Sequence, residues 1–271
     1  MNPIFATGLP RTGTTWVASL ISAATGSDLA FEPYNWRLHP EAADFHMKYL
    51  PSGSDDQRFI RIAESAFGAS ERVVLKDVHC CLGIEYLWET LHPIVVIIIR
   101  HPCAMANSWA KVGWGADFRI EILLNQSRLV DEHLSPFRDH LTSSNEYFFQ
   151  LGAYWGASYY VISRIAAAHQ DWNWVTHESL CRQPTAGFKT LLDAMGLSMR
   201  EEGYAFLREH DRELGKDEDP LDIPARITAL QPDLWKHELE SEQTELVVEG
   251  AKPFGILEKF YGMHRAIRAV D

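Results

Sequence analysis

Residues 8–15 read Gly8-Leu9-Pro10-Arg11-Thr12-Gly13-Thr14-Thr15 and directly follow the apolar run Ile4-Phe5-Ala6. The two glycines keep the frame of the nucleotide-triphosphate loop G-x-x-x-x-G-K-[ST], in which the lysine reaches the terminal phosphates. Here Thr14 takes the place of that lysine, and the cation has moved back into the loop as Arg11. The stretch therefore predicts a loop that binds a nucleotide phosphate, between a strand and a helix, without ATP chemistry.

Backbone and side chains both supply such a loop with donors. The N–H groups at the start of a helix converge on one point and carry roughly half a positive charge. Thr12, Thr14 and Thr15 add hydroxyl donors. The planar guanidinium of Arg11 suits two oxygens of one anion. Apolar residues at helical spacing over 16–24 predict the helix that follows. The alternative interpretation is a surface turn rich in Thr and Gly.

Length and composition predict one large α/β domain. The chain has 271 residues, 46% of them hydrophobic, and we expect residues 1–271 to form a single domain. The net charge of −12 argues against nucleic acid as a partner. The four cysteines match no zinc or disulfide pattern, so we expect buried, reduced thiols and no metal site. No apolar run approaches the ~20 residues of a membrane span and no secretion signal is visible, which favours a cytoplasmic location away from membranes.

The order of the elements predicts a three-layer P-loop fold. Apolar runs typical of buried strands occupy residues 3–6, 73–75, 94–99 and 172–176. Helical patterns separate them, at residues 14–24, 41–49, 58–67, 83–91, 104–110 and 147–169. This alternation predicts a central, mostly parallel sheet flanked by helices. We expect a helical insertion, a candidate lid, at residues 117–145, a helical region after Ala186 and a polar loop at 215–220.

Polar residues gather where the predicted strands end. Arg11 follows the first strand, Lys76-Asp77 the second, Arg100-His101-Pro102 the third and His177-Glu178 the fourth. Folds of this kind bind ligands at the carboxyl ends of their strands. Ser108 lies eight residues past Arg100, in the helix that Pro102 introduces, so the two side chains are expected to converge on one anion. The alternative is a salt bridge at the sheet edge and an ordinary small helix residue.

Together, the two constellations resemble the sulfotransferases that use 3′-phosphoadenosine-5′-phosphosulfate (PAPS). The resemblance implies that the first loop binds the 5′-phosphosulfate through Arg11, Thr12, Gly13, Thr14 and Thr15. It also implies that Arg100 and Ser108 bind the 3′-phosphate and that Trp16 stacks on the adenine. The alternative for Trp16 is a buried aromatic that anchors the first helix. The desulfated product would be 3′-phosphoadenosine-5′-phosphate (PAP).

Further segments are similar to elements of the same family. Phe31-Glu32-Pro33 follows the first helix at a spacing seen in the carbohydrate and protein-tyrosine sulfotransferases. Residues 74–77, Val-Leu-Lys-Asp, look like a second-strand element that ends in proline in those enzymes, with Val78 in its place. Residues 176–180 are similar to the family's Tyr-Glu-Asp-Leu, with His177 where a tyrosine is common. The resemblance covers residues 1–195.

The last quarter of the chain departs from the family pattern. Trp235-Lys236 is present, but the Arg-Lys-Gly run that often precedes such a pair, and closes over the 3′-phosphate, is missing. Residues 227–230 read Ile-Thr-Ala-Leu instead, with Arg226 nearby as a substitute.

The residues suggest how a sulfuryl group would be transferred. In-line transfer needs positioning and charge stabilisation more than covalent chemistry by the protein. We expect Arg11 to stabilise the bridging and 5′-phosphate oxygens, and Lys76 the sulfuryl oxygens. The acceptor must also lose a proton to a general base. Glu32, whose place fits the base of the carbohydrate and tyrosine subgroups, and His79 are the two candidates.

The position of His79 leaves the choice of base open. In the small-molecule enzymes of the family the base is a histidine two residues after the lysine, and His79 lies three residues after Lys76. If that stretch stays extended, the offset turns the His79 side chain to the opposite face. His101 and His177 are expected to be structural or peripheral.

The acceptor is expected to be a hydroxyl on a small molecule or glycoconjugate. Aromatic residues cluster in stretches expected near the pocket, although core packing also explains those on long helices: Tyr34, Trp36, Trp109, Trp114, Tyr154, Trp155, Tyr159 and Tyr160. One competing function is a P-loop kinase, which would need a lysine at position 14 and an acidic residue such as Asp77 for Mg²⁺. The other is a non-catalytic nucleotide-binding protein.

Overall fold

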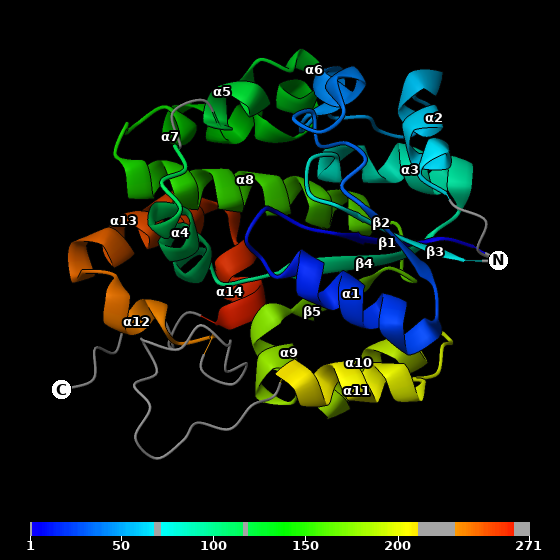
Figure 1. Ribbon diagram of the computed structural model, residues 1–271. Coiled ribbons are helices and arrows are strands. Elements are labelled where there is room, and N and C mark those ends of the chain that lie inside the picture. The colour runs from blue at the N-terminus through cyan, green and yellow to red at the C-terminus, as the bar shows by residue number, and fades with distance from the viewer. Residues whose placement is uncertain (1, 68–71, 116–118, 211–230, 263–271) are drawn as a thin grey trace.

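A sheet of parallel strands with helices on both faces forms the centre of the protein (Figure 1). The computed structural model describes residues 2–67, 72–115, 119–210 and 231–262. Within these ranges the sheet has five strands: β1 Ile4–Thr7, β2 Asp28–Phe31, β3 Val73–Asp77, β4 Ile94–Ile99 and β5 Asn173–Thr176. They pair in the order β2-β3-β1-β4-β5, and each pair is parallel. The predicted α/β fold class is confirmed.

The strands divide their side chains between two hydrophobic cores. In β4, Val96 and Ile98 belong to one core, whereas Val95, Ile97 and Ile99 belong to the other. Helices that cover the first face are α1 Thr14–Thr25, α9 His177–Arg182, α10 Pro184–Ala194 and α11 Glu201–His210. Those that cover the second are α2 Gln57–Ser65, α3 Ile84–Leu91, α4 Pro102–Lys111, α8 Tyr147–Ala166 and α13 Ser241–Ala251. Because both faces are covered, β4 is apolar at every position.

Strand β2 is absent from the sequence prediction. Its apolar part, Leu29-Ala30-Phe31, is short and contains no β-branched residue, and its burial is partial because it lies at the edge of the sheet. Pairing with β3 holds it in place, with Phe31 opposite Lys76. The peptide N–H of Glu32 continues the ladder by donating to the Lys76 carbonyl oxygen at 2.7 Å. Glu32 therefore follows a strand, and not the first helix directly, which fixes it beside Lys76.

The segment predicted as a helix over residues 41–49 is also different. A short 3₁₀-helix, Pro40–Phe45, ends at His46, which has extended backbone angles. Met47 then takes a left-handed φ of 53°, and its N–H donates to the carbonyl oxygen of His79 at 2.6 Å. This bond to the loop after β3 replaces the next helical bond. It also brings His46 next to His79.

The predicted insertion is helical but fragmented. Residues 119–141 form α5 Arg119–Leu124, α6 Ser127–Leu129, a π-helical turn over Val130–Leu134, a 3₁₀ turn over Ser135–Phe137 and α7 Arg138–Leu141. The helical region after Ala186 ends with α12 Trp235–Glu238 and α14 Ile256–Tyr261, and the predicted polar loop at 215–220 lies outside the described residues. All four cysteines are free and buried, as expected. No helix in the described ranges has the length and apolarity needed to cross a membrane.

Candidate functional site

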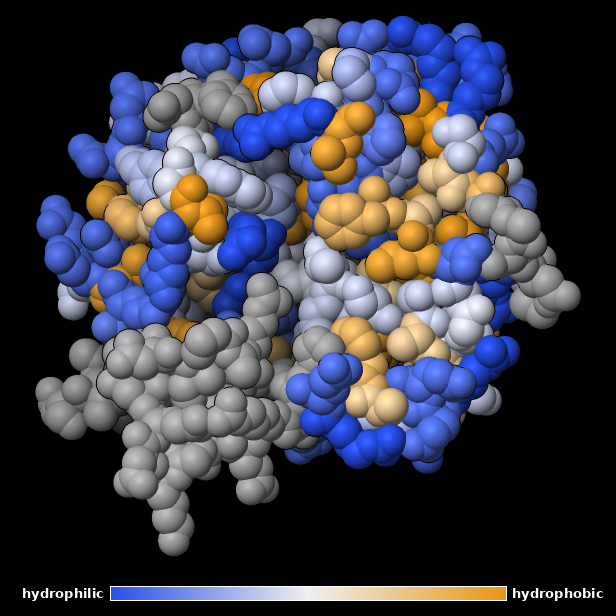
Figure 2. All heavy atoms as spheres, viewed as in Figure 1, coloured by the Kyte–Doolittle hydropathy of each residue, from blue (hydrophilic) through white to orange (hydrophobic). Residues whose placement is uncertain are grey.

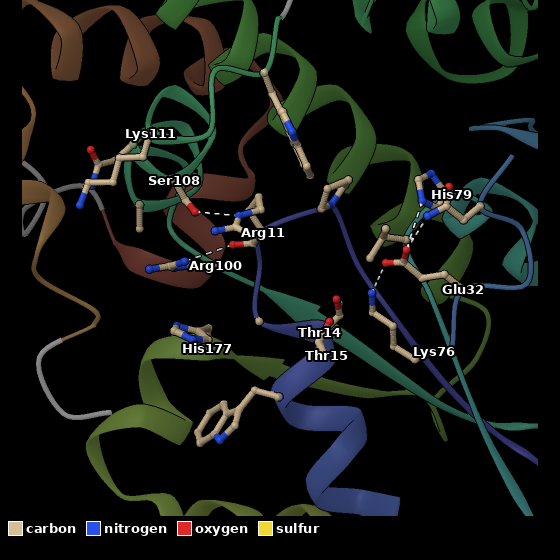
Figure 3. Close-up of a pocket in the computed structure, with 18 of the residues that line it drawn as sticks. Arg11, Thr14, Thr15, Glu32, Lys76, His79, Arg100, Ser108, Lys111 and His177 are labelled. Atoms are coloured by element: carbon tan, nitrogen blue, oxygen red, sulfur yellow. Dashed lines mark hydrogen bonds and ion pairs between the residues drawn. The ribbon is translucent and has the colours of Figure 1, made fainter. Parts of the chain in front are cut away.

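A pocket of about 920 Å³ opens where the strands end. Its lining includes these residues that the sequence singled out: Arg11, Gly13, Thr14, Thr15, Trp16, Glu32, Lys76, His79, Arg100 and Ser108. Thr12 is the exception, because its fully buried hydroxyl donates to the Leu9 carbonyl oxygen at 2.7 Å. This bond gives Thr12 a role in holding the loop, and its part in binding an anion stays a prediction. Figure 3 shows Arg11, Ser108 and Arg100 on one side of the pocket and Glu32, Lys76 and His79 on the other.

The loop between β1 and α1 is shaped by two left-handed residues. Arg11 has a φ of 69°, and Gly13, which precedes the helix, has a φ of 88°. A Cβ atom on Gly13 would lie 2.3 Å from Cδ2 of His177, so the loop can touch α9 only because this residue is glycine. The first N–H groups of a helix have no partners within it. Since Thr14 and Thr15 line the pocket at this point, the start of α1 presents donors to an anion there.

Three side chains extend this anion-binding region, which we call the loop end of the pocket: Arg11, Arg100 and Ser108. The Nε atom of Arg11 donates to the Ser108 hydroxyl at 2.9 Å, and Nη1 of Arg100 donates to the Arg11 carbonyl oxygen at 3.1 Å. The Nε atom of Arg100 is buried and has no hydrogen-bond partner among the described residues. Arg100 and Ser108, which were expected to converge on one anion, thus both contact Arg11.

His177, which was expected to be structural or peripheral, lies at the loop end as well. It is the first residue of α9, it lines the pocket, and its ring meets that of Trp16 edge-on with centroids 5.9 Å apart. Trp16 itself is half-buried and packs edge-on against Phe188 at 5.0 Å. The sequence signal that places His177 at this site is its position at the end of a predicted strand, the same signal that pointed to Arg11 and Arg100.

At the opposite side of the pocket, a buried carboxylate is surrounded by donors. We call this group, Glu32 with Lys76, Asn35 and His79, the carboxylate end. The Lys76 ammonium donates to Oε1 of Glu32, and Nδ2 of Asn35 donates to Oε2 at 2.8 Å. Nε2 of His79 lies 3.7 Å from Oε2. The Lys76 side chain is 3% exposed and that of Glu32 is 13% exposed, so water screens this pair little.

These donors control the charge of Glu32. Burial by itself would raise the pKa of the carboxyl group, but the contacts with His79 and Lys76 and the charge of Lys76 outweigh it and lower the pKa to about 2. Glu32 is therefore ionised at neutral pH. A carboxylate oxygen pair accepts about four hydrogen bonds, so three donors leave room for one more.

His79 faces the same pocket as Lys76, so the predicted offset does not turn it away. Strand β3 ends at Asp77, and the chain bends there because the Asp77 carboxylate accepts hydrogen bonds from the N–H groups of His79 at 2.6 Å and Cys80 at 3.3 Å. The N–H of Tyr34 donates to the same carboxylate at 2.8 Å. Asp77 is fully buried by these contacts and does not line the pocket.

Aromatic residues surround the pocket less than the sequence suggested. Of the predicted aromatic set, Trp36 and Trp114 line it, whereas five others are fully buried in the core: Tyr34, Trp109, Tyr154, Trp155 and Tyr159. Phe31, which the aromatic prediction did not include, lines it too, and Phe31 and Trp36 are 46% and 42% exposed. Apolar patches lie near the middle of the face shown in Figure 2.

The C-terminal part of the chain contributes Trp235 to the pocket. Its ring stacks on that of His101 with centroids 4.7 Å apart and an angle of 8° between them. Lys236 instead forms an ion pair with Asp233 at 2.6 Å. Arg226 and residues 227–230, the departure from the family pattern, lie outside the described residues. Within the described ranges, no three His, Cys, Asp or Glu side chains are grouped to hold a metal ion.

Comparisons with known proteins find likeness at the level of solved structures. No protein-family model and no curated protein matches the sequence. The mouse sulfotransferase SULT7A1, complexed with PAP, aligns over 96% of this chain and 89% of its own, with 12% identity and a TM-score of 0.46. A sulfotransferase domain from the curacin biosynthetic pathway aligns over 92% and 97%, with 13% identity and a TM-score of 0.49. A sulfotransferase domain from the olefin synthase of Synechococcus PCC 7002 aligns over 94% of both, with 18% identity and a TM-score of 0.49. The chain is thus similar to sulfotransferases in its fold.

Proposed function

We propose that the protein is a sulfotransferase that moves the sulfuryl group of PAPS to a hydroxyl of a small molecule or glycoconjugate. The observation that supports this most is the pairing of two features in one pocket. The loop end offers a phosphate-binding loop without the triphosphate lysine, together with Arg11, Arg100 and Ser108. The carboxylate end offers a buried Lys76–Glu32 pair. A sulfuryl donor with two phosphate groups needs the anion-binding residues of the loop end. An acceptor that must lose a proton needs the carboxylate of the other end.

The residues of the loop end fit the donor substrate. Arg100 lines the pocket beside Ser108, and Nη1 of its guanidinium is held at the loop end by the Arg11 carbonyl oxygen. A phosphate there would meet a guanidinium and a hydroxyl donor. We therefore assign the 3′-phosphate to Arg100 and Ser108 and the 5′-phosphate to Arg11, Thr14 and Thr15. The half-buried ring of Trp16 is available at the same end for the adenine.

The proposed reaction is an in-line displacement at sulfur. The acceptor oxygen forms a bond to sulfur while the bond from sulfur to the bridging phosphate oxygen breaks, and that oxygen keeps the electron pair. Arg11 neutralises the charge that grows on the bridging oxygen, and Lys76 stabilises the sulfuryl oxygens. The acceptor's proton goes to Glu32, which has one unused lone-pair site for that hydroxyl.

A carboxylate with a pKa of about 2 is a weak base, and the arrangement explains how it acts. As the new oxygen–sulfur bond forms, the acceptor hydroxyl becomes acidic. If Lys76 turns from Glu32 towards the sulfuryl oxygens, the carboxylate also loses a donor, and its pKa rises towards the value that favours proton transfer. Lys76 and Glu32 would thus act together.

Contacts of Asp77 disfavour the kinase alternative. A P-loop kinase needs an acidic side chain that reaches Mg²⁺ beside the phosphates. Asp77 is the sequence candidate, but its carboxylate accepts three backbone N–H bonds outside the pocket lining. Thr14 also stands where the lysine should be. Burying the charges of Lys76 and Glu32 costs free energy of desolvation. A role in the reaction accounts for that cost, whereas a non-catalytic binding protein has no use for the pair.

Ligand binding and turnover test the proposal in two steps. In a thermal-shift assay we expect PAP to raise the melting temperature strongly, AMP weakly and ATP with Mg²⁺ weakly. Turnover is then measured as PAP released from PAPS with phenol, alcohol and sugar acceptors. A preference for ATP, or no shift with PAP, would remove the assignment.

A further inference from the structure

Two histidines and an arginine connect to Glu32 in a chain of contacts. Nη1 of Arg119, the first residue of α5, lies 3.2 Å from Nε2 of His46. Nδ1 of His46 lies 3.2 Å from Nδ1 of His79. Nε2 of His79 then faces Oε2 of Glu32. His46 and Arg119 both line the pocket, and the sequence singled out neither.

The chemistry at the Arg119 end fixes where the protons lie. A guanidinium only donates hydrogen bonds, so Nε2 of His46 accepts from Arg119 and carries no proton. A neutral imidazole carries its one proton on the other nitrogen, which for His46 is Nδ1. Burial lowers the pKa of His46 to about 3, and the positive groups around it act in the same direction, so the ring is neutral.

The same reasoning passes from His46 to His79. Because Nδ1 of His46 bears a proton, it donates to Nδ1 of His79, which accepts. His79 then keeps its proton on Nε2, the nitrogen that faces Glu32. Every donor in the chain points towards the carboxylate.

We propose that His46 is a positioning residue that holds His79 in the Nε2–H tautomer, so that His79 donates to Glu32 and Glu32 alone accepts the acceptor's proton. The second half of this statement rests on the proposed sulfuryl transfer. It answers the choice between Glu32 and His79 that the sequence leaves open. In this tautomer the nitrogen of His79 that faces the reacting groups has no lone pair to take a proton. His79 instead stabilises the carboxylate in its ionised form.

Two substitutions at His46 provide the test. The substitutes are equal to each other in size, but one can donate a hydrogen bond to His79 and the other can only accept one. In His46→Asn, the side-chain amide replaces the Nδ1–H donor, so His79 keeps its tautomer. In His46→Asp, the carboxylate accepts from Nδ1 of His79, so both ring nitrogens of His79 then face a carboxylate and both carry a proton. The two variants differ by one polar atom and serve as each other's control.

Histidine tautomers are read by two-bond ¹H–¹⁵N correlation spectra of the ¹⁵N-histidine-labelled protein at neutral pH, with His79→Gln used to assign the signals. We expect His79 to be protonated on Nε2 alone in the wild type and in His46→Asn, and on both nitrogens in His46→Asp. Protonation of Nδ1 in the wild type would overturn the proposal, as would the same protonation pattern in both variants. This measurement needs no substrate, so it is independent of whether the protein transfers sulfuryl groups.

Kinetics test the positioning role. We expect kcat of His46→Asp to fall about 100-fold with the KM for PAPS unchanged, because a positive charge on His79 makes Glu32 a weaker base while the loop end is intact. His46→Asn should remain within about threefold of the wild type. Equal losses in both variants, or a loss expressed in the KM for PAPS, would contradict the proposal.

Discussion

The two ends of the pocket are constructed in different ways. At the loop end, the geometry is set by the backbone: left-handed angles at Arg11 and Gly13, the start of α1, and a hydrogen bond from Arg100 to a main-chain oxygen. At the carboxylate end, side chains hold one another: Glu32 is bound by Lys76, Asn35 and His79, from separate segments. Backbone geometry survives most single substitutions, glycine positions such as Gly13 excepted, whereas side-chain contacts are lost with single substitutions. The loop end therefore suits a constant ligand, and the carboxylate end suits chemistry adjusted to one acceptor.

The largest expected effect breaks the carboxylate end and leaves the loop end intact. Glu32→Gln removes the proposed base, and we expect kcat to fall by about 1,000-fold while the affinity for PAP is unchanged. Turnover of PAPS and calorimetric titration with PAP measure the two quantities. Glu41→Gln, at an exposed carboxylate on the neighbouring 3₁₀-helix, is the matched control and should retain activity. Wild-type turnover in Glu32→Gln would move the base elsewhere.

The same substitution has an effect on stability that depends on pH. At pH 7 it leaves Lys76 buried without its carboxylate, and we expect the free energy of unfolding to fall by about 3 kcal/mol, which corresponds to a carboxyl pKa lowered from 4.5 to about 2. A lowered pKa stabilises the fold above the unfolded value and loses that contribution as the pH falls towards the folded value. Urea unfolding should thus show a constant difference above about pH 5 that closes towards pH 2. A difference independent of pH would show that the carboxylate charge is not its cause.

Gly13→Ala damages the loop end through the backbone. The new Cβ would lie 2.3 Å from the His177 ring, so we expect PAP to bind roughly 30- to 100-fold more weakly, as measured by calorimetry. Gly53→Ala is a matched control, because Gly53 has a similar φ of 74° but open space around its Cβ position. Adding His177→Ala to Gly13→Ala should restore part of the affinity. If the two glycine variants bind PAP equally, contact with His177 is not what requires glycine.

Arg100→Ala tests the loop end at the level of one phosphate. Loss of a charge-assisted contact to the 3′-phosphate should reduce the preference for PAP over AMP by roughly tenfold. Calorimetric affinities for both nucleotides give this ratio. Arg37→Ala is the control, because it removes a cation of the pocket lining that does not belong to the loop end, and it should leave the ratio as it is. An unchanged ratio in Arg100→Ala would place the 3′-phosphate elsewhere.

Much of the fold was predictable because its signals are local. The apolar run over β4 and the helical periodicity of α1, α2, α3, α4 and α8 gave these elements to within a few residues. Strand β2 was missed because its three apolar residues include no β-branched one, and pairing with β3 holds them in the sheet. The helix expected at 41–49 failed because a hydrogen bond from Met47 to His79 competes with the next helical bond.

For the site, the amino-acid sequence by itself determined the loop between β1 and α1, whereas Arg100 and Ser108 reach Arg11 only through the tertiary structure. The glycines, the threonines and Arg11 are neighbours in the chain, and a strand–turn–helix gives such neighbours one geometry wherever it occurs. Only the tertiary structure decided the carboxylate end. Glu32 meets Lys76 because β2 pairs with β3, and His46 meets His79 because two loops bond to each other. Contacts between residues so far apart in the chain depend on strand register and loop packing, which no local pattern encodes.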